Sequence, residues 1–256
     1  MFYLKQWAGD DGKLWEYKER YRGVLPRRVF ADSTGYRHGL YSVPGMPPEK
    51  RQYVETTYMS WVDNHAAVAL KAMLDESRLA LDFPLRFKVA WARFLFSLTF
   101  RSPNVIKRLQ VQMDEQVAGG AIRQPEIPFV AAEVFPSMLQ SKTVIRELIS
   151  MTWVTGRLYH ADQPLLTSDR PIIMTNGLVQ PEAHIVLPIS PRIFFLAYRT
   201  EAVFNHIAAK SQKELAAQIN DHVTRQAIDF VYAFDDSQTD FIQKRLGQRA
   251  RSTPLG

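Results

Sequence analysis

The chain has 256 residues and no cysteine, and its 32 Lys and Arg against 26 Asp and Glu give a formal net charge of +6. With 46% apolar and 23% charged residues, it is not a disordered chain, a collagen-like fibre or a coiled coil. Without cysteine it forms neither disulfides nor thiolate metal sites. A chain of this length buries roughly 70–75% of its unfolded surface, which is enough to support a core.

No apolar run approaches the roughly 20 residues that cross a bilayer, because Arg93 and Arg101 bracket the longest one. The first seven residues lack the charged start, apolar middle and cleavage site of a secretory signal. We therefore expect a cytoplasmic protein with no membrane span. The six histidines include no pair at helical ligand spacing, so they predict no metal site, and the sequence implies no particular cofactor.

The positive charge is concentrated in two segments near the ends of the chain. Residues 16–28 hold five basic residues against two acidic ones, and residues 243–256 hold four basic residues and no acidic one. The rest of the chain is therefore nearly neutral. Such segments can contact phosphate, which makes a nucleic acid a possible partner, although a basic segment is more often only solvated.

The first half of the chain is predicted to begin with strands and to continue with helices. Asp10-Asp11-Gly12 is typical of a hairpin turn between two apolar segments, and a loop rich in Gly, Pro and Arg follows. Pro47-Pro48 then favours a helix start. The predicted elements are strands at 2–7 and 14–17 and helices at about 49–74, 85–101, 103–118 and 136–154.

After Gly156 the pattern changes to short apolar runs separated by Pro, Gly and Asn, which is typical of strands. These predicted strands are 165–167, 172–174, 184–187 and 193–198. A last helix begins at Ser211, where Glu214 completes a capping box, and continues to about Tyr232.

This order of elements predicts an α+β fold with N-terminal strands, a block of about four helices, a short-stranded sheet after residue 156 and a C-terminal helix. No flexible linker divides the chain, so we expect one domain over residues 1–242. Residues 243–256 are expected to form a basic, mobile tail.

Polar residues interrupt the apolar stripes of three predicted helices, where burial is costly unless the group is paired or used. Glu55 begins the stripe of the first helix, and Asp63 lies about 80° around the same helix on a 3.6-residue period. Arg101 is in register with the stripe of the second helix, and Asn220 with that of the last one. A buried arginine needs a carboxylate partner.

A second polar group lies in Thr167-Ser168-Asp169-Arg170-Pro171, which is interpreted as a tight turn between two strands. Asp169 can accept backbone amides in such a turn or direct its carboxylate into a cleft. Two interpretations stay open. In the first, Glu55 and Arg101 form a buried ion pair and Asp169 is an ordinary turn residue. In the second, all three line a functional pocket together with Asn220.

At these residues the sequence resembles the bacterial "domain of unknown function 4238" family, over almost the whole chain. The matching pieces, in order, are Phe2-Tyr3-Leu4-Lys5-Gln6-Trp7, Glu55 with Asp63, Arg101-Ser102-Pro103, Thr167-Ser168-Asp169-Arg170-Pro171, Leu187-Pro188-Ile189-Ser190-Pro191-Arg192 and Asn220. Members of that family begin with a His-x-x-Pro segment before the Tyr-Leu pair. Here Met1 and Phe2 stand in that place, so the true start lies upstream or this copy lacks the histidine. The resemblance implies no reaction.

The leading functional hypothesis is a polar cleft that hydrolyses a phosphate-containing substrate. Arg101 would hold the anionic group, and Asp169 or Glu55 would act as base or bind a divalent cation. Ser168, Asn220 and Asp63 would contribute to substrate binding. The alternative is a non-catalytic module that binds a nucleic acid or an acidic protein through residues 16–28 and 243–256.

Overall fold

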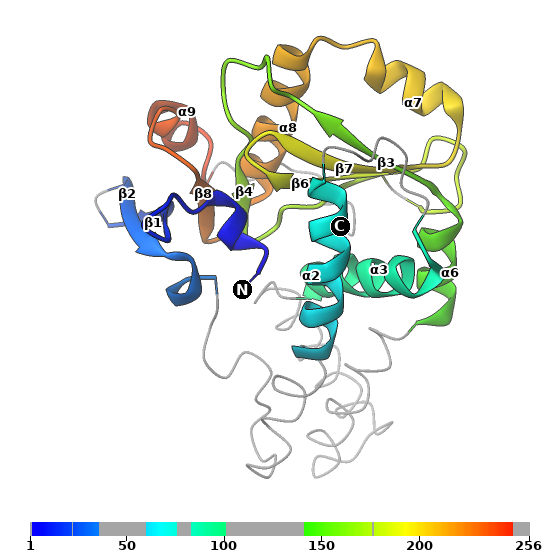
Figure 1. The fold of residues 1–256 in the computed structure, drawn as a ribbon. Helices are drawn as coiled ribbons and strands as arrows, with labels where there is room; N and C mark the ends of the chain where they lie inside the picture. Colours follow the sequence, from blue (N-terminus) through cyan, green and yellow to red (C-terminus); the bar gives the residue numbers. More distant parts are fainter. Residues whose placement is uncertain are drawn as a thin grey trace, which may run out of the picture.

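The computed structural model describes residues 2–21, 23–35, 60–75, 83–100, 141–175 and 177–247. Within these ranges helices pack against two antiparallel sheets, which confirms the predicted α+β class (Figure 1). The strands are β1 (Lys13–Arg20), β2 (Gly23–Phe30), β3 (Thr152–Arg157), β4 (Thr167–Ser168), β5 (Ile173–Met174), β6 (His184–Ser190), β7 (Ile193–Tyr198) and β8 (Phe230–Ala233). The α-helices are α2 (Ser60–Leu74), α3 (Leu85–Phe100), α6 (Lys142–Ser150), α7 (Glu201–Ala208), α8 (Gln212–Gln226) and α9 (Thr239–Gln243), and the 3-10 helices are η1 (Leu4–Trp7) and η2 (Ala31–Ser33).

The two sheets differ in which parts of the chain they join. The first sheet has the order β2-β1-β8-β4, so the C-terminal strand β8 lies between β1 and β4. One row across it is Glu16–Tyr232–Thr167. The second sheet has the order β3-β7-β6-β5 and uses only the region after α6. The first sheet therefore ties the beginning of the chain to its end.

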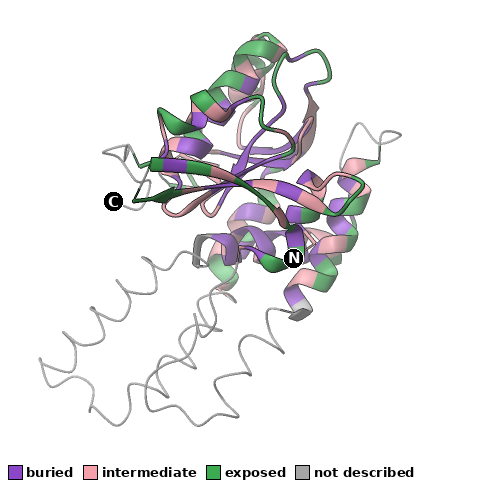
Figure 2. Ribbon diagram, turned by 90° about the vertical axis from the view of Figure 1, so that its left-hand side faces the viewer, coloured by how far each residue is buried: buried purple, intermediate pink, exposed green. Residues whose placement is uncertain are grey.

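Both faces of the second sheet are covered by helices (Figure 1). Phe195 and Ala197 of β7 face a large core formed with η1, α2, α3 and α6, whereas Phe194, Leu196 and Tyr198 face a second core formed with α7 and α8. Every residue of β7 is buried for this reason. Figure 2 shows buried residues, in purple, concentrated in the middle of the described part of the molecule. A continuous apolar run is what a strand covered on both sides requires.

The apolar stripes predicted for two helices are core faces. Val62, Ala66 and Met73 of α2 are fully buried, as are Trp91 and Phe94 of α3. The predicted helix at 85–101 is confirmed as α3, and that at 49–74 is confirmed from Ser60 onward. The predicted helix at 103–118 lies outside the described residues. At the last predicted helix, the Ser211 hydroxyl accepts the Glu214 amide at 3.2 Å, which confirms the N-cap.

The prediction of a strand at 2–7 is wrong, because this segment forms the 3-10 helix η1. Tyr3, Leu4 and Trp7 recur at helical spacing, and all three side chains are buried on one side of the segment. The N-terminal hairpin turns instead between Arg20 and Gly23, where Gly23 adopts a φ of 96°. Strand β2 lies where the sequence predicts a loop. The sequence does not indicate this strand because only one of its side chains, Val24, is buried, so apolar and polar residues do not alternate along it.

Two predicted helices are longer than the observed ones. Helix α6 ends at Ser150 and β3 follows at once, because Trp153 packs in the large core as part of the second sheet. Helix α8 ends at Gln226, and β8 pairs with β1 and β4. In both places helical periodicity continues into residues that form strands, since tertiary pairing outweighs local propensity. The sequence pattern does not predict helices α7 and α9.

Among the described helices, none combines the length and the apolar character that crossing a bilayer requires.

Candidate functional site

A polar segment at residues 164–172, which we call the central segment, lies where β4, α8 and β8 meet. Asn220 of α8 is fully buried against it. Its Oδ1 accepts the Leu166 amide at 2.8 Å, and its Nδ2 donates to the Pro164 carbonyl at 3.0 Å and to Gln238 Oε1 at 2.9 Å. All the donors of Asn220 are thus used within the fold, which accounts for a polar residue on an apolar stripe.

Gln238, just before α9, completes this arrangement, and sequence reasoning missed it. The residue is 1% exposed, and its Nε2 donates to the Pro164 carbonyl at 2.7 Å. The Pro164 carbonyl therefore accepts from both buried amides, of Asn220 and of Gln238. No local pattern marks Gln238, because it lies in a short loop rather than on an apolar stripe.

The N-terminal residues hold the other side of the central segment. The Tyr3 hydroxyl donates to the Pro188 carbonyl and is 2.7 Å from the Thr167 hydroxyl, which leaves Thr167 as the donor of that second bond. The Trp7 indole N–H donates to the Leu165 carbonyl at 2.7 Å. Burial raises the pKa of Tyr3 far above its usual value, so the residue stays a neutral hydroxyl. The aromatic residues at the start of the chain are therefore anchors for the central segment.

Asp169 follows β4 and holds the connection between α8 and β8. Its Oδ1 accepts the Ile228 amide at 3.0 Å and its Oδ2 accepts the Asp229 amide at 2.9 Å, while its own amide donates to the Phe230 carbonyl at 3.1 Å. Burial raises the pKa of Asp169 to about 6, against the lowering effect of the two amides, and the nearby Asp229 raises it further. A half-buried carboxyl that titrates near 6 is suited to proton transfer.

Ser168 and Asp63 have different surroundings. The buried Ser168 hydroxyl accepts the Arg170 amide at 3.1 Å, and Gln226 Nε2 donates to the Ile172 carbonyl at 3.0 Å and to the Arg170 carbonyl. Asp63 lies half-buried in the first turn of α2. The structure therefore brings Asp169, Ser168 and Asn220 together around one segment and leaves Asp63 on another helix. The predicted residues Glu55 and Arg101 lie outside the described residues.

A row of polar side chains crosses the first sheet beside Asp169, and sequence reasoning missed it too. Glu16 is 7% exposed, and its carboxylate accepts the Thr34 hydroxyl, which in turn lies 3.3 Å from the Tyr232 hydroxyl. Burial raises the pKa of Tyr232 far above its usual value against the effect of the Thr34 hydrogen bond, and the carboxyls of Glu16, Asp169 and Asp229 raise it further. Period-two alternation could have marked Glu16, because it lies on the same face as the buried Leu14.

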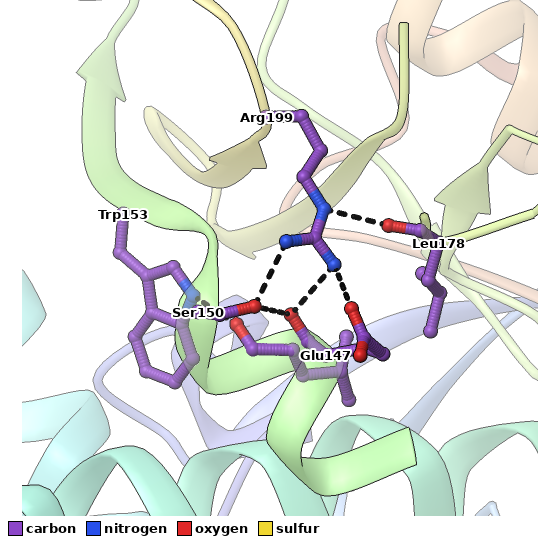
Figure 3. A network of polar contacts seen from close by, with 6 residues as sticks. Glu147, Ser150, Trp153, Leu178 and Arg199 are labelled. Carbon is purple, nitrogen blue, oxygen red and sulfur yellow. Dashed lines mark hydrogen bonds and ion pairs between the residues drawn. The ribbon is translucent and has the colours of Figure 1, made fainter. Parts of the chain in front are cut away.

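A charged cluster around Arg199 shows the same inward use of polar groups (Figure 3). The Arg199 guanidinium donates to the Leu178 carbonyl at 2.8 Å and to the Ser150 hydroxyl at 2.9 Å, and it pairs with the Glu147 carboxylate. The neighbouring Trp153 indole donates to the Leu148 carbonyl at 2.9 Å. Arg199 therefore ties the end of β7 to α6.

The β1–β2 hairpin differs from these sites because, apart from the buried Glu16 of β1, many of its charged groups face solvent. Tyr21, at the turn, is fully exposed, and Leu25 and Phe30 of β2 are 42% and 55% exposed. The side chains of Arg20 and Arg27 are exposed, and the Lys18 ammonium lies 4.6 Å from the centre of the Phe230 ring. Basic and aromatic groups thus alternate over this hairpin.

The second basic segment begins against this hairpin. Gln243, at the end of α9, donates from its Nε2 to the Val24 carbonyl of β2 at 3.0 Å. Leu246 is buried beside Tyr17 and Val24 in a third apolar cluster, and Arg245 pairs with Asp221 at 2.6 Å. The exposed Lys244 follows α9 directly. The fold therefore places the beginning of the second basic segment beside the first, although the two lie near opposite ends of the chain.

Within the described ranges, no three histidine or acidic side chains are arranged to hold a metal ion. The family model described as "Protein of unknown function (DUF4238)" matches residues 1–237. No curated protein and no solved structure matches the chain significantly.

Proposed function

Because the chain belongs to the DUF4238 family, whose function is not known, we propose its function from its own geometry: it binds a nucleic acid through the β1–β2 hairpin and the basic segment that follows α9. The observation that carries this proposal is the fully exposed ring of Tyr21, which directly follows the exposed Arg20 at the end of β1. A base can stack on such a ring while guanidinium groups contact the neighbouring phosphates.

The charges around the hairpin support the same proposal. Arg20 and Arg27 extend from it into solvent, and Lys244 follows α9 beside it. Some basic groups are already compensated, since Arg28 pairs with Asp11 at 2.9 Å and Arg245 with Asp221. We therefore expect Arg20, Arg27 and Lys244 to supply the contacts that depend on salt.

The test measures fluorescence anisotropy of labelled single-stranded RNA and DNA with the full chain over a series of salt concentrations. We expect Tyr21→Ser to weaken binding about tenfold, because stacking of one base contributes about 1–3 kcal/mol. Arg20→Gln and Arg27→Gln should each lower the slope of log Kd against log salt by about one. Tyr159→Ser is the matched control, since Tyr159 is also exposed but follows β3, in the second sheet.

Binding that is unchanged in Tyr21→Ser, or a salt slope that Arg20→Gln and Arg27→Gln leave intact, would reject this proposal. Removal of residues 248–256 provides a second measurement, because those residues carry Arg249 and Arg251. The shortened chain should keep its fold and bind more weakly.

A second candidate function, hydrolysis of a phosphate-containing substrate, is favoured by the position of the half-buried Asp169 carboxyl, which the Ile228 and Asp229 amides hold in place and whose burial raises its pKa to about 6. In this proposal Asp169 acts as the base that activates water, and Arg101 holds the anionic group. Asn220 and Ser168 keep the central segment in place. A base must be deprotonated to act, so the rate should rise with pH through about 6 and level off above it.

The corresponding experiment assays a panel of phosphodiesters with added magnesium or manganese against the wild type, Asp169→Asn and Arg101→Ala. Activity that falls by about 100-fold in Asp169→Asn, with the fold retained, would support the proposal. Background rates that are the same in all three proteins would end it. Both variants leave the hairpin intact, so nucleic-acid binding and hydrolysis can fail separately.

A further inference from the structure

Helices α7 and α8 lie over one face of the second sheet (Figure 1). A cavity of about 600 Å³ is lined by residues of these two helices and of that sheet. Its volume falls within the range of about 300–1,000 Å³ that is usual for small-molecule sites. The cavity shares no lining residue with the central segment or with the β1–β2 hairpin. It is therefore separate from both sites discussed above.

The floor of this cavity is apolar because it consists of residues of the second core, which lies between the second sheet and the helices α7 and α8. It is formed by Ile173, Val186, Phe194, Val203, Ile207 and Ile219. The ring of Phe194 lies directly over Gly156 of the neighbouring strand, so that a Cβ on Gly156 would overlap it. The absence of a side chain at Gly156 thus makes room for the Phe194 ring.

The rim of the cavity carries nitrogen-bearing side chains. His206 and Lys210 come from α7 and the turn after it, His222 comes from α8, and His184 begins β6. The His184 Nδ1 lies 2.9 Å from the Glu182 carbonyl, so this nitrogen carries the proton, and Nε2 is the nitrogen available to a ligand. The Lys210 ammonium donates to Gln218 Oε1 at 2.8 Å, and this bond uses one of the three N–H donors of Lys210.

We propose that this cavity binds a small amphipathic anion, with its apolar body against Phe194, Val186 and Ile219 and its carboxylate or phosphate head among His206, Lys210 and His222. The apolar floor favours a hydrocarbon or aromatic body. The rim presents the side chains of His206, Lys210 and His222, which can donate hydrogen bonds to an anionic head, and one carboxylate, that of Glu182. The proposal does not depend on nucleic-acid binding or on hydrolysis.

The first experiment uses calorimetry to titrate the full chain with four probes that each contain a ten-carbon chain: decanoate, decyl phosphate, decanol and decyltrimethylammonium. We expect the two anions to bind, decanol to bind at least tenfold more weakly and the cation to show no saturable binding. Decanoate and decyl phosphate separate a carboxylate head from a phosphate head.

Matched variants locate the binding. Ala202→Phe and Ala208→Phe both enlarge an exposed alanine of α7, but only Ala202 lines the cavity. Ala202→Phe should abolish binding of both anions, and Ala208→Phe should leave it unchanged. Similarly, Lys210→Ala should weaken binding of the anions at least fivefold without affecting decanol, and His160→Ala, which changes an exposed histidine outside the cavity, should change nothing.

Equal binding of the cation and the anions, or binding that survives Ala202→Phe, would overturn the proposal. Circular dichroism and thermal unfolding of each variant check that the fold is retained. If Ala202→Phe fails to fold, Lys210→Ala still decides the matter, because it alters only a partly exposed side chain at the rim.

Discussion

The central segment and the β1–β2 hairpin both carry many polar side chains, yet they use them in opposite ways. At the central segment, Asn220, Gln238 and Tyr3 are buried, and their donors and acceptors are used inside the protein. At the hairpin, Arg20 and Tyr21 extend into water. The polar groups of the first region therefore contribute to the free energy of unfolding, whereas the exposed side chains of the second are accessible to a partner.

This difference changes how a polar residue on an apolar stripe is interpreted. The sequence predicts Asn220 as a substrate-binding residue because its burial needs an explanation, and its three hydrogen bonds within the fold provide one. The exposed polar and aromatic groups of the hairpin are accessible to a partner, whereas the buried Asn220 is not, so the hairpin is the better place to look for a binding site.

The largest expected effect is that of Asn220→Ala, which we expect to lower the free energy of unfolding by roughly 3–4 kcal/mol. The substitution leaves the buried Leu166 amide without its acceptor and Gln238 without one of its partners. Chemical denaturation measures the change. The control is Gln218→Ala on the same helix, because the amide of Gln218 is exposed and its hydrogen bonds are made at the surface. A loss below about 1 kcal/mol in Asn220→Ala would remove the distinction between the two regions.

Asp169 provides a prediction on pH dependence. Its pKa is raised from 3.8 to about 6 in the folded protein, so between these values the folded state binds the proton more tightly than the unfolded one. The stability that this group contributes is present at low pH and is lost as the pH rises through about 6. The wild type should therefore lose about 2 kcal/mol more than Asp169→Asn over this range. Stability that instead rises with pH would mean that the Ile228 and Asp229 amides outweigh burial.

Arg199→Met tests whether an inward-facing ionic group elsewhere behaves like the central segment. The change removes the hydrogen bonds to Leu178 and Ser150 and leaves the partly buried Glu147 without its ion-pair partner. We expect a loss of about 2 kcal/mol in the free energy of unfolding, measured by chemical denaturation. The control is Lys213→Met, because the pair of Lys213 with Asp162 is largely exposed and should contribute little to the measured free energy of unfolding.

The smallest expected effects are those of the hairpin on stability. Tyr21→Ser and Arg20→Gln should change the free energy of unfolding by less than about 0.5 kcal/mol, since both side chains are exposed. Thermal unfolding in the absence of nucleic acid measures this. A larger loss of unfolding free energy in either variant would show that these hairpin side chains stabilise the fold, and the hairpin would then not differ from the central segment in this respect.

Much of the fold could be predicted because it rests on local patterns. The stripes of α2 and α3, the capping box at Ser211 and the apolar run of β7 all lie within a few turns or residues. The predictions failed where the local pattern is silent or misleading. The edge strand β2 has too few buried residues to show alternation, and the strand β8 continues the apolar stripe of the helix before it.

Local sequence patterns were enough to establish the α+β class, the family, the core faces of the helices and the short list of polar residues that had to be explained. The contacts of those residues depend on the folded chain: Asn220 meets Gln238, Tyr3 meets Thr167, and the basic segments from the two ends of the chain meet beside β2. The physical reason is the range of the interactions. Periodicity and capping act over a few residues, whereas strand pairing and the burial of polar groups join segments far apart in the sequence, such as those of Tyr3 and Thr167, that meet only when the core forms.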